Sequence, residues 1–508
     1  MTRGAVVLDG SSLTLDDVRA VARDRVAVQL TAEARAHMLR TRSIVEEAAD
    51  SGAAVYGVNT GFGTLSEVSI AREQVDALQV NVIRSHAAGV GDPMPAEETR
   101  AMMLLRANVL AGGRAGARPG VAELLCEMLN AGLHPVVPEQ GSVGASGDLA
   151  PLAHLALPLI GEGELFHAGS GRRGPATDVL RAAGLSPIRL GPKEGISLIN
   201  GTQAHTAIAA LLCVDARAIW ASAQVAGAMS LEALLGTPVA FDERIHEARG
   251  QRGQERAAAV LRSLLAGSEI RESHRAGDPR VQDAYSLRCI PQVHGAVLDA
   301  LDWVEAMVAR ELNAATDNPL VFDDGAMLSG GNFHGQPVAL ALDVLAIALS
   351  TLATMSERRT DRLVHPDFNQ GLPAFLAPDP GLHSGFMMAQ VTAAALASEC
   401  KLLAHPASVD SIPTDGSKED IVPMAMGAAL KARRVVENVR HVVAIELMCA
   451  AQGVDYRAPL RAGAGVISAH RAVRQSIPTL GDDRVLSGDI ATIAELIRAG
   501  TFMQGEPA

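Results

Sequence analysis

Long apolar segments separated by short polar loops fill the second half of this chain. Ala and Leu dominate these segments, and few glycines or prolines interrupt them. Their apolar residues occur on nearly every face, which predicts helices that are buried on several sides. We therefore predict a mainly α-helical fold with a long central bundle, and the surplus apolar surface indicates that the bundle continues across subunits. The segments cover residues 203–235, 295–315, 335–363, 384–404 and 423–452.

The first 200 residues have a mixed pattern that is richer in loops. Thr14 followed by Asp17 is typical of a capping box at the start of a helix. We divide the chain into an N-terminal part, residues 1–200, and a long-helix bundle domain with a C-terminal extension, residues 201–508. Shorter helices are expected at 72–87, 96–114 and 118–132, and short strands near 5–8, 164–166 and 320–329.

Charge and cysteine usage exclude several classes of partner. The net charge is −13 and no basic block interrupts the acidic balance, so neither nucleic acid nor an anionic membrane is expected to bind. Five widely spaced cysteines without a CxxC pair indicate reduced thiols in a cytoplasmic protein, with no metal centre. The apolar run 337–355 contains Asp343, which favours a buried core helix over a membrane span.

A turn of small residues stands out in the N-terminal part. The stretch 141–151 reads GSVGASGDLAP and leads into an apolar helix. Such a turn has three interpretations: a helix cap formed by Ser146 with Asp148 as a first-turn acid, an anion cradle, or a backbone that reacts. The anion cradle is the weakest, because no Lys-Ser/Thr pair follows the glycines as in a P-loop.

Other loops between the helices combine glycine with polar side chains. Each alone is typical of an ordinary helix connection, but together they supply Tyr, His, Asn, Gln, Arg, Phe and Glu, which suits a polar small-molecule site. These loops are YGVNTGFG (56–63), SHAAGVG (85–91), INGTQ (199–203), VQDAYSLR (281–288), SGGNFHGQP (329–337) and SIPTDGSKEDIVPM (411–424).

These motifs, in this order, closely resemble those of the aromatic amino acid ammonia-lyases, and most nearly the histidine-specific members. The resemblance runs from about residue 5 to about residue 480. It implies a fumarase- and histidase-like helical architecture. It also implies a homotetramer whose sites draw loops from more than one subunit, with no metal or soluble cofactor.

The resemblance implies that Ala145-Ser146-Gly147 cyclises to a 4-methylidene-imidazol-5-one. The nitrogen of Gly147 attacks the carbonyl of Ala145, and loss of water converts Ser146 to a dehydroalanine. Glycine is the least hindered backbone nucleophile, and the flanking glycines allow the turn to compress.

The same resemblance assigns roles around this electrophile. Tyr56 would be the base that removes the β-proton, and a phenol with a pKa of about 10 would need a nearby cation to lower that pKa. Arg288 would hold the substrate carboxylate as a bidentate fork, although a surface ion pair is the ordinary alternative. Asn200, Gln282 and the catalytic Tyr285 would orient the carboxylate, the amine and the electrophile.

The substrate side chain is implied by three further residues. His86 and Glu419 match the residues that hold an imidazole in the histidine-specific members, and Phe333 would form a wall for the ring. A carboxylate that faces an imidazole N–H is specific, whereas the same carboxylate against a benzene ring would be a buried unpaired charge. The implied reaction is the non-oxidative deamination of L-histidine to urocanate and ammonia.

One departure from the family pattern leaves alternatives open. The chain reads Lys418-Glu419-Asp420-Ile421 where the family usually has Gln-Glu-Asp-His, and Lys418 could pair with either acid. A lyase or 2,3-aminomutase acting on another aromatic amino acid or a histidine derivative therefore stays possible. A fumarase-type lyase would need a GSSxMPxKxN loop, which the chain lacks. A non-enzymatic protein on the same fold would keep Ser146 intact.

Overall fold

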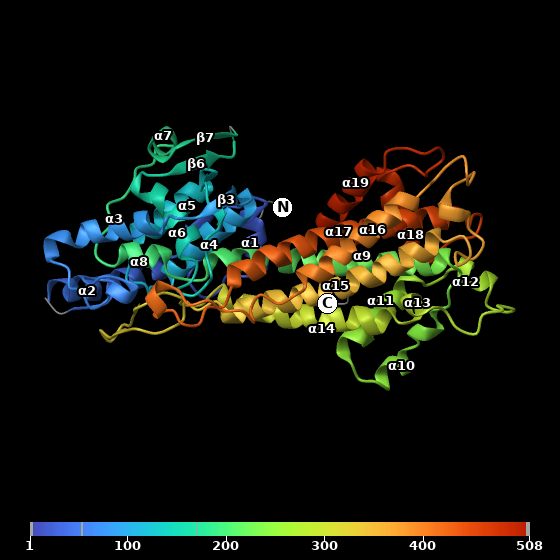
Figure 1. The fold of residues 1–508 in the computed structure, drawn as a ribbon, viewed down its shortest axis with the longest axis horizontal. Helices are drawn as coiled ribbons and strands as arrows, with labels where there is room; N and C mark the ends of the chain where they lie inside the picture. Colours follow the sequence, from blue (N-terminus) through green and yellow to red (C-terminus); the bar gives the residue numbers. More distant parts are fainter. Residues whose placement is uncertain (1–3, 52–53, 170, 504–508) are drawn as a thin grey trace. The chain divides into compact units, whose positions relative to one another are not determined.

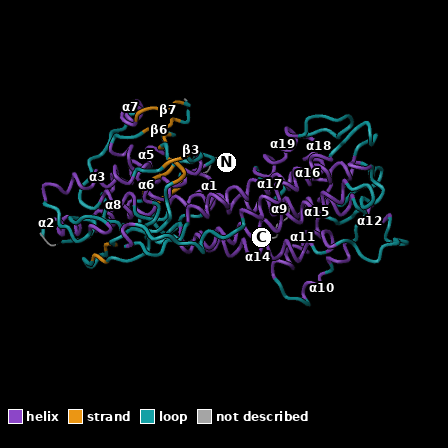
Figure 2. Tube along the Cα trace, viewed as in Figure 1, coloured by secondary structure: helices purple, strands orange, loops and turns teal. Residues whose placement is uncertain are grey.

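Helices dominate this protein, as the apolar pattern predicts (Figure 2). The computed structural model describes residues 4–51, 54–169 and 171–503. These residues form two compact units, each built from three separate segments of the sequence. Unit 1 comprises 1–214, 305–343 and 406–430, and unit 2 comprises 215–304, 344–405 and 431–508. The predicted division at residue 200 stays a prediction.

Helix α4 (Ala96–Ala111) of unit 1 is buried along almost its whole length. Helix α4 contacts α5 (Pro119–Asn130) and α1 (Leu15–Ala22), and these helices are drawn in blue and cyan in Figure 1. The predicted capping box is confirmed, because the Thr14 side chain accepts from the Asp17 N–H and Asp17 accepts from the Thr14 N–H. The other helices of this unit are α2 (Ala32–Asp50), α3 (Val75–His86), α6 (Leu149–Ala156), α7 (Ala176–Ala182) and α8 (Glu194–Ile199).

The strands of unit 1 are short and form small separate sheets. Strands β1 (Val6–Leu8) and β2 (Val28–Leu30) pair in parallel. The antiparallel sets are β3 (Val90–Pro93) with β5 (Pro138–Gln140), β4 (Leu133–Pro135) with β6 (Glu164–His167) and β7 (Arg172–Pro175), and β8 (Leu320–Val321) with β9 (Met327–Leu328). The short strands expected near 5–8, 164–166 and 320–329 are therefore confirmed, within a residue or two.

The five long helices occur where the apolar segments predict them. By length and apolarity α9 and α15 could cross a membrane, but 89% and 67% of their most apolar windows are buried, which favours the core-helix interpretation. The helices are α9 (Gln203–Ala233), α14 (Ile290–Glu311), α15 (Gln336–Val364), α16 (Met387–Leu403) and α17 (Ala425–Asp455).

A buried ion pair joins the long helices of unit 2. Arg359 of α15 donates to Glu446 of α17 at 2.5 and 2.8 Å, and both side chains are fully buried. The hydroxyls of Ser230 and Ser356 also donate to this carboxylate, at 2.7 and 2.6 Å. Because every oxygen of Glu446 has a donor, its burial is compensated. The shorter helices are α10 (Glu243–Glu247), α11 (Arg252–Leu264), α12 (Glu269–Ser273), α13 (Tyr285–Arg288), α18 (Ala464–Ser476) and α19 (Ser487–Arg498).

A second buried acid in unit 2, Glu232, has a different environment. Its carboxylate accepts the Gly463 N–H at 2.9 Å. Burial raises the pKa of Glu232 to about 7, and the hydrogen bonds from Ser268 and Gly463 offset only part of that effect. The folded-state pKa is above the unfolded value, so the stability linked to this group is present at low pH and is lost as the pH rises through about 7.

We expect Glu232→Gln to raise the thermal unfolding midpoint at about pH 8, because it removes a buried charge whose cost is on the order of 3 kcal/mol. The gain should shrink as the pH is lowered to about 5, where the parent acid is protonated. Thermal unfolding followed by circular dichroism across this range measures it. Glu495→Gln, on the exposed face of α19, is the matched control. A midpoint difference that does not change with pH would contradict the assignment.

Candidate active site

The Ala145-Ser146-Gly147 turn is pressed against Gly201. Gly147 has φ +74°, and a Cβ added to it would lie 2.1 Å from the carbonyl oxygen of Gly201. The two glycines form a parallel β-bridge, and the Asp148 N–H donates to the Gly201 carbonyl at 2.7 Å. Only glycine fits at position 147, both for its backbone angle and for this close approach.

Asp148 anchors the turn to the start of α9. Its Oδ2 atom accepts the N–H groups of Ala204 and His205 at 2.9 and 3.0 Å, and Oδ1 accepts the Ser142 hydroxyl at 2.8 Å. Burial raises its pKa, but the His205 ring, 2.8 Å away, and these hydrogen bonds outweigh burial, so the pKa lies below the usual value. Asp148 is therefore an ionised side chain that caps α9, and its side chain does not cap α6.

Two further segments hold the other side of the turn. The Gly335 N–H donates to the carbonyl of Gly144 at 2.9 Å, and the Ala425 N–H donates to Val143 at 3.3 Å. The Ser146 hydroxyl donates to Glu419, so the interpretation of Ser146 as a helix cap is wrong. The turn thus lies among the start of α9, the GNFHG loop and the loop that precedes α17.

Asn200 follows α8 on the segment that leads to Gly201. The fully buried Arg106 of α4 donates to the carbonyls of Ser197 and Asn200, each at 3.0 Å, and to the side chain of Gln203. Among the described residues, the Asn200 Oδ1 atom is buried without a hydrogen-bond partner. A buried acceptor of this kind is costly unless a ligand donor reaches it.

Tyr56 lies half-buried in its glycine-rich loop. The Gly63 N–H points to its phenol oxygen at 3.5 Å, and the ring of Phe62 lies edge-on with a centroid distance of 6.2 Å. Burial raises the pKa of Tyr56, and the carboxylates of Asp415, Asp317 and Glu419 raise it further. No cation lowers this pKa within the described residues, so the need for a cation and for the field of the electrophile stays a prediction.

His86 and Glu419 are the two residues expected to recognise an imidazole. His86 ends α3, and burial lowers its pKa although Asp415 and Glu419 act in the opposite direction, so its ring is neutral at neutral pH. The Glu419 carboxylate accepts from Ser146 and Thr414. Among the described residues no ion pair joins Lys418 to either neighbouring acid, and Lys418 is exposed.

Phe333 belongs to a loop that contacts this region. It is half-buried, and the next residue, His334, has its Nε2 atom 3.2 Å from the carbonyl oxygen of Ile421. Unit 1 thus carries eight of the predicted site residues, namely Tyr56, His86, Ala145, Ser146, Gly147, Asn200, Phe333 and Glu419.

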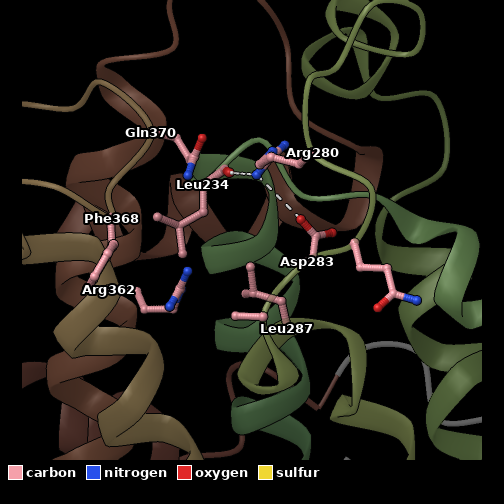
Figure 3. Close-up of a pocket in the computed structure, with 9 residues that line it drawn as sticks. Leu234, Arg280, Asp283, Leu287, Arg362, Phe368 and Gln370 are labelled. Atoms are coloured by element: carbon pink, nitrogen blue, oxygen red, sulfur yellow. Dashed lines mark hydrogen bonds and ion pairs between the residues drawn. The ribbon is translucent and has the colours of Figure 1, made fainter.

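The other three predicted residues, Gln282, Tyr285 and Arg288, belong to unit 2. Tyr285 is 70% exposed, and the Cζ atom of Arg288 lies 4.7 Å from the centre of its ring. Among the described residues the Arg288 Nε atom is buried without a partner, so a surface ion pair does not account for this residue. Gln282 is among the residues that line a small pocket, as are Arg280 and Arg362. Figure 3 shows this pocket and labels the two arginines.

Two residues of this region escape sequence reasoning. Arg106 directly follows the apolar run 101–105 of α4, and an arginine in that place is a signal that could have been recognised. Asp415 contacts Thr64, which lies 351 residues away, and nothing in the local pattern indicates that pairing.

The model of the aromatic amino acid lyase family matches residues 13–475. This match and the helical fold define a helical lyase that breaks carbon–nitrogen bonds.

Relatives match along nearly the whole chain. A histidine ammonia-lyase of Anaeromyxobacter dehalogenans is 57% identical, covering 98% of this chain and 99% of the relative. The crystal structure of histidine ammonia-lyase from Trypanosoma cruzi superimposes with a TM-score of 0.92 at 44% identity, covering 98% of this chain and 94% of that one. Tyrosine aminomutase from Streptomyces globisporus gives 0.93 at 38% identity, covering 98% of both chains. The chain belongs to the aromatic amino acid lyase family, whose members in general depend on methylidene-imidazolone.

We expect Gly147→Ala to lower the unfolding midpoint more than Gly250→Ala does. Gly250 has a similar φ of +73° but open space around its Cβ position, so it measures the backbone strain alone, about 1–2 kcal/mol. At Gly147 the added methyl must also displace Gly201. Thermal unfolding of both variants measures the difference, and equal losses would mean that the close contact with Gly201 is absent.

Proposed function

We propose that this protein converts L-histidine to urocanate and ammonia. The observation that carries the proposal is the position of Glu419 beside the electrophile turn, where it accepts the Ser146 hydroxyl before that residue is dehydrated. Burial keeps the ring of His86 neutral although Glu419 raises its pKa, and a neutral ring beside an acid suits the same substrate. The names of the most similar relatives agree with it.

The turn fits the internal electrophile that the family uses. Ala145 is 3% exposed, and the positive φ of Gly147 and its lack of a side chain allow the backbone to compress. We infer that Ala145-Ser146-Gly147 forms a 4-methylidene-imidazol-5-one without a metal or a soluble cofactor. This group supplies an electrophile that makes the substrate nitrogen a better leaving group.

Side chains of the site bind the substrate and remove its β-proton. The phenolate oxygen of Tyr56 takes the β-proton, the electron pair of that C–H bond forms the Cα–Cβ double bond, and ammonia leaves with the C–N electrons. The unpaired Oδ1 of Asn200 accepts a hydrogen bond from the substrate amine. Arg288 binds the carboxylate, and Gln282 and Tyr285 orient the amine and the electrophile.

The substrate ring would be held by three residues. Glu419 accepts the imidazole N–H, His86 offers a neutral ring nitrogen, and Phe333 packs on the ring face. Dehydration of Ser146 would remove one of the two hydroxyl groups that donate to Glu419 among the described residues, which leaves that carboxylate oxygen to accept a ligand N–H. The aminomutase alternative differs only in returning ammonia to the β-carbon, and the relative from Streptomyces globisporus keeps it open.

We propose a cytoplasmic homotetramer whose sites combine loops of different subunits. Helix α16 supports the assembly, because its buried residues are small, Ala389, Ala393 and Cys400, while several of its large apolar side chains are exposed. Uncovered apolar surface of this kind is typical of a subunit interface. The exposed large apolar residues of α15 and α16 are Leu340, Ile347, Met388, Val391 and Leu402.

The experiment that tests this function is product analysis after incubation with L-histidine. Urocanate and ammonia in equal amounts support the proposal, and a β-amino acid product would favour the aminomutase.

We expect Ser146→Ala to abolish turnover, by at least about a thousandfold, while the circular dichroism spectrum is unchanged. Substantial turnover by this variant would exclude the internal electrophile.

We expect Glu419→Gln to reduce the preference for L-histidine over L-phenylalanine by about tenfold to a hundredfold, because an amide binds an imidazole N–H less well than a carboxylate does. The ratio of kcat/KM values for the two amino acids measures it. Lys418→Gln, at the exposed neighbouring position, is the control. An unchanged preference in Glu419→Gln would mean that the substrate is not an imidazole.

A further inference from the structure

Asp415 connects two loops of unit 1 that are remote in sequence. Its carboxylate accepts the Thr64 N–H at 3.2 Å, and the Thr64 hydroxyl donates to its carbonyl oxygen at 2.5 Å and to its Oδ1 atom at 3.2 Å. The short helix η1 (Gly63–Leu65) packs against η6 (Asp415–Ser417). We call these contacts the Asp415–Thr64 latch.

The latch acts on the turn that holds Tyr56. The N–H of Gly63, the residue before Thr64, points to the phenol oxygen of Tyr56. A Cβ on Gly63 would lie 2.1 Å from Asp415 Oδ2, so the carboxylate sits directly against this turn. Movement of Asp415 would therefore move the group that fixes the phenol oxygen.

The other end of the same loop reaches the electrophile turn. Thr414 and Glu419 form an antiparallel bridge, and the Thr414 hydroxyl donates to Glu419. Glu419 in turn accepts from Ser146. The backbone between them is tight, with positive φ at Asp415, Gly416 and Ser417. Such angles are costly for residues with side chains and persist where the surrounding contacts require them.

We propose that Asp415 is a positioning residue for the elimination, which through the latch fixes the phenol oxygen of Tyr56 relative to Ser146 and Glu419. The proposal rests on the proposed function of Tyr56 and goes beyond it, because Asp415 reaches the phenol only through the Gly63–Thr64 turn.

The charge of Asp415 also affects the pKa values of two residues of the site. Asp415, Asp317 and Glu419 all raise the pKa of Tyr56, and Asp415 and Glu419 raise that of His86. The Asp317 charge is balanced by Lys193 at 2.5 Å. Removal of the Asp415 charge lowers both pKa values, so the phenolate and the neutral imidazole persist to lower pH.

Three variants separate position from charge. Asp415→Ala removes the charge and the carboxylate contacts of the latch but keeps the carbonyl acceptor, Asp415→Asn keeps a side-chain acceptor for Thr64, and Thr64→Val removes the hydroxyl donor. Asp410→Asn is the matched control, since its carboxylate accepts from Ser411 on the same loop. Size-exclusion chromatography and circular dichroism establish that each variant is folded, and if Asp415→Ala is not, the other two carry the test.

The first measurement is hydrogen exchange of the peptide that spans Gly63 and Thr64, which needs no turnover. We expect exchange to be at least about tenfold faster in Asp415→Ala, and intermediate in Thr64→Val, because a lost contact lowers the free energy of local opening. Exchange equal to that of the parent would overturn the proposal. This measurement tests the positioning role even if L-histidine is not the substrate. Product analysis of the parent tests the substrate separately.

The second measurement is the pH profile of kcat with L-histidine. We expect Asp415→Ala to lower kcat by about tenfold to a hundredfold with less than about a threefold change in KM. Asp415→Asn should keep kcat within about threefold and move the acid limb of the profile to lower pH, which a purely structural role would not do. Coincident limbs for the parent and Asp415→Asn, or parental kcat in Asp415→Ala, would overturn the proposal.

Discussion

The contact between Gly147 and Gly201 is the constraint on which this site depends. The Asp148 N–H binds the Gly201 carbonyl at 2.7 Å, while its carboxylate caps the first N–H groups of α9. A fully buried charge of this kind is retained only where every oxygen has a donor, and here backbone N–H groups and Ser142 supply them, with the His205 ring 2.8 Å away. The start of the long helix α9 thereby holds the Ala145-Ser146-Gly147 turn in place, so a stable helix determines the shape of the reactive turn.

A tension between binding and proton transfer follows from the charges of unit 1. Glu419 suits an imidazole, but together with Asp317 and Asp415 it raises the pKa of Tyr56, the group proposed as the base. The base therefore requires positive charge that these carboxylates do not provide.

The sequence predicts the elements of this fold well, and the contacts of its site only in part. The long helices follow from apolar runs, and Thr14 and Asp17 mark a helix start correctly, because these signals are local. The direction in which the surroundings shift the pKa of Tyr56 could not be predicted, because it depends on charges such as Asp415 and Glu419 that are far away along the chain. The latch to Thr64 and the capping of α9 by Asp148 likewise join distant segments, which no periodicity reveals.

The central claim is that the Ala145-Ser146-Gly147 backbone reacts with itself, and the mass of the intact purified protein tests it most directly. Closure of the ring and dehydration of Ser146 each release one water, so the account predicts a mass two waters below that of the encoded chain, with the deficit in the peptide that contains residues 145–147. An unshifted mass in a preparation that turns over substrate would contradict the account.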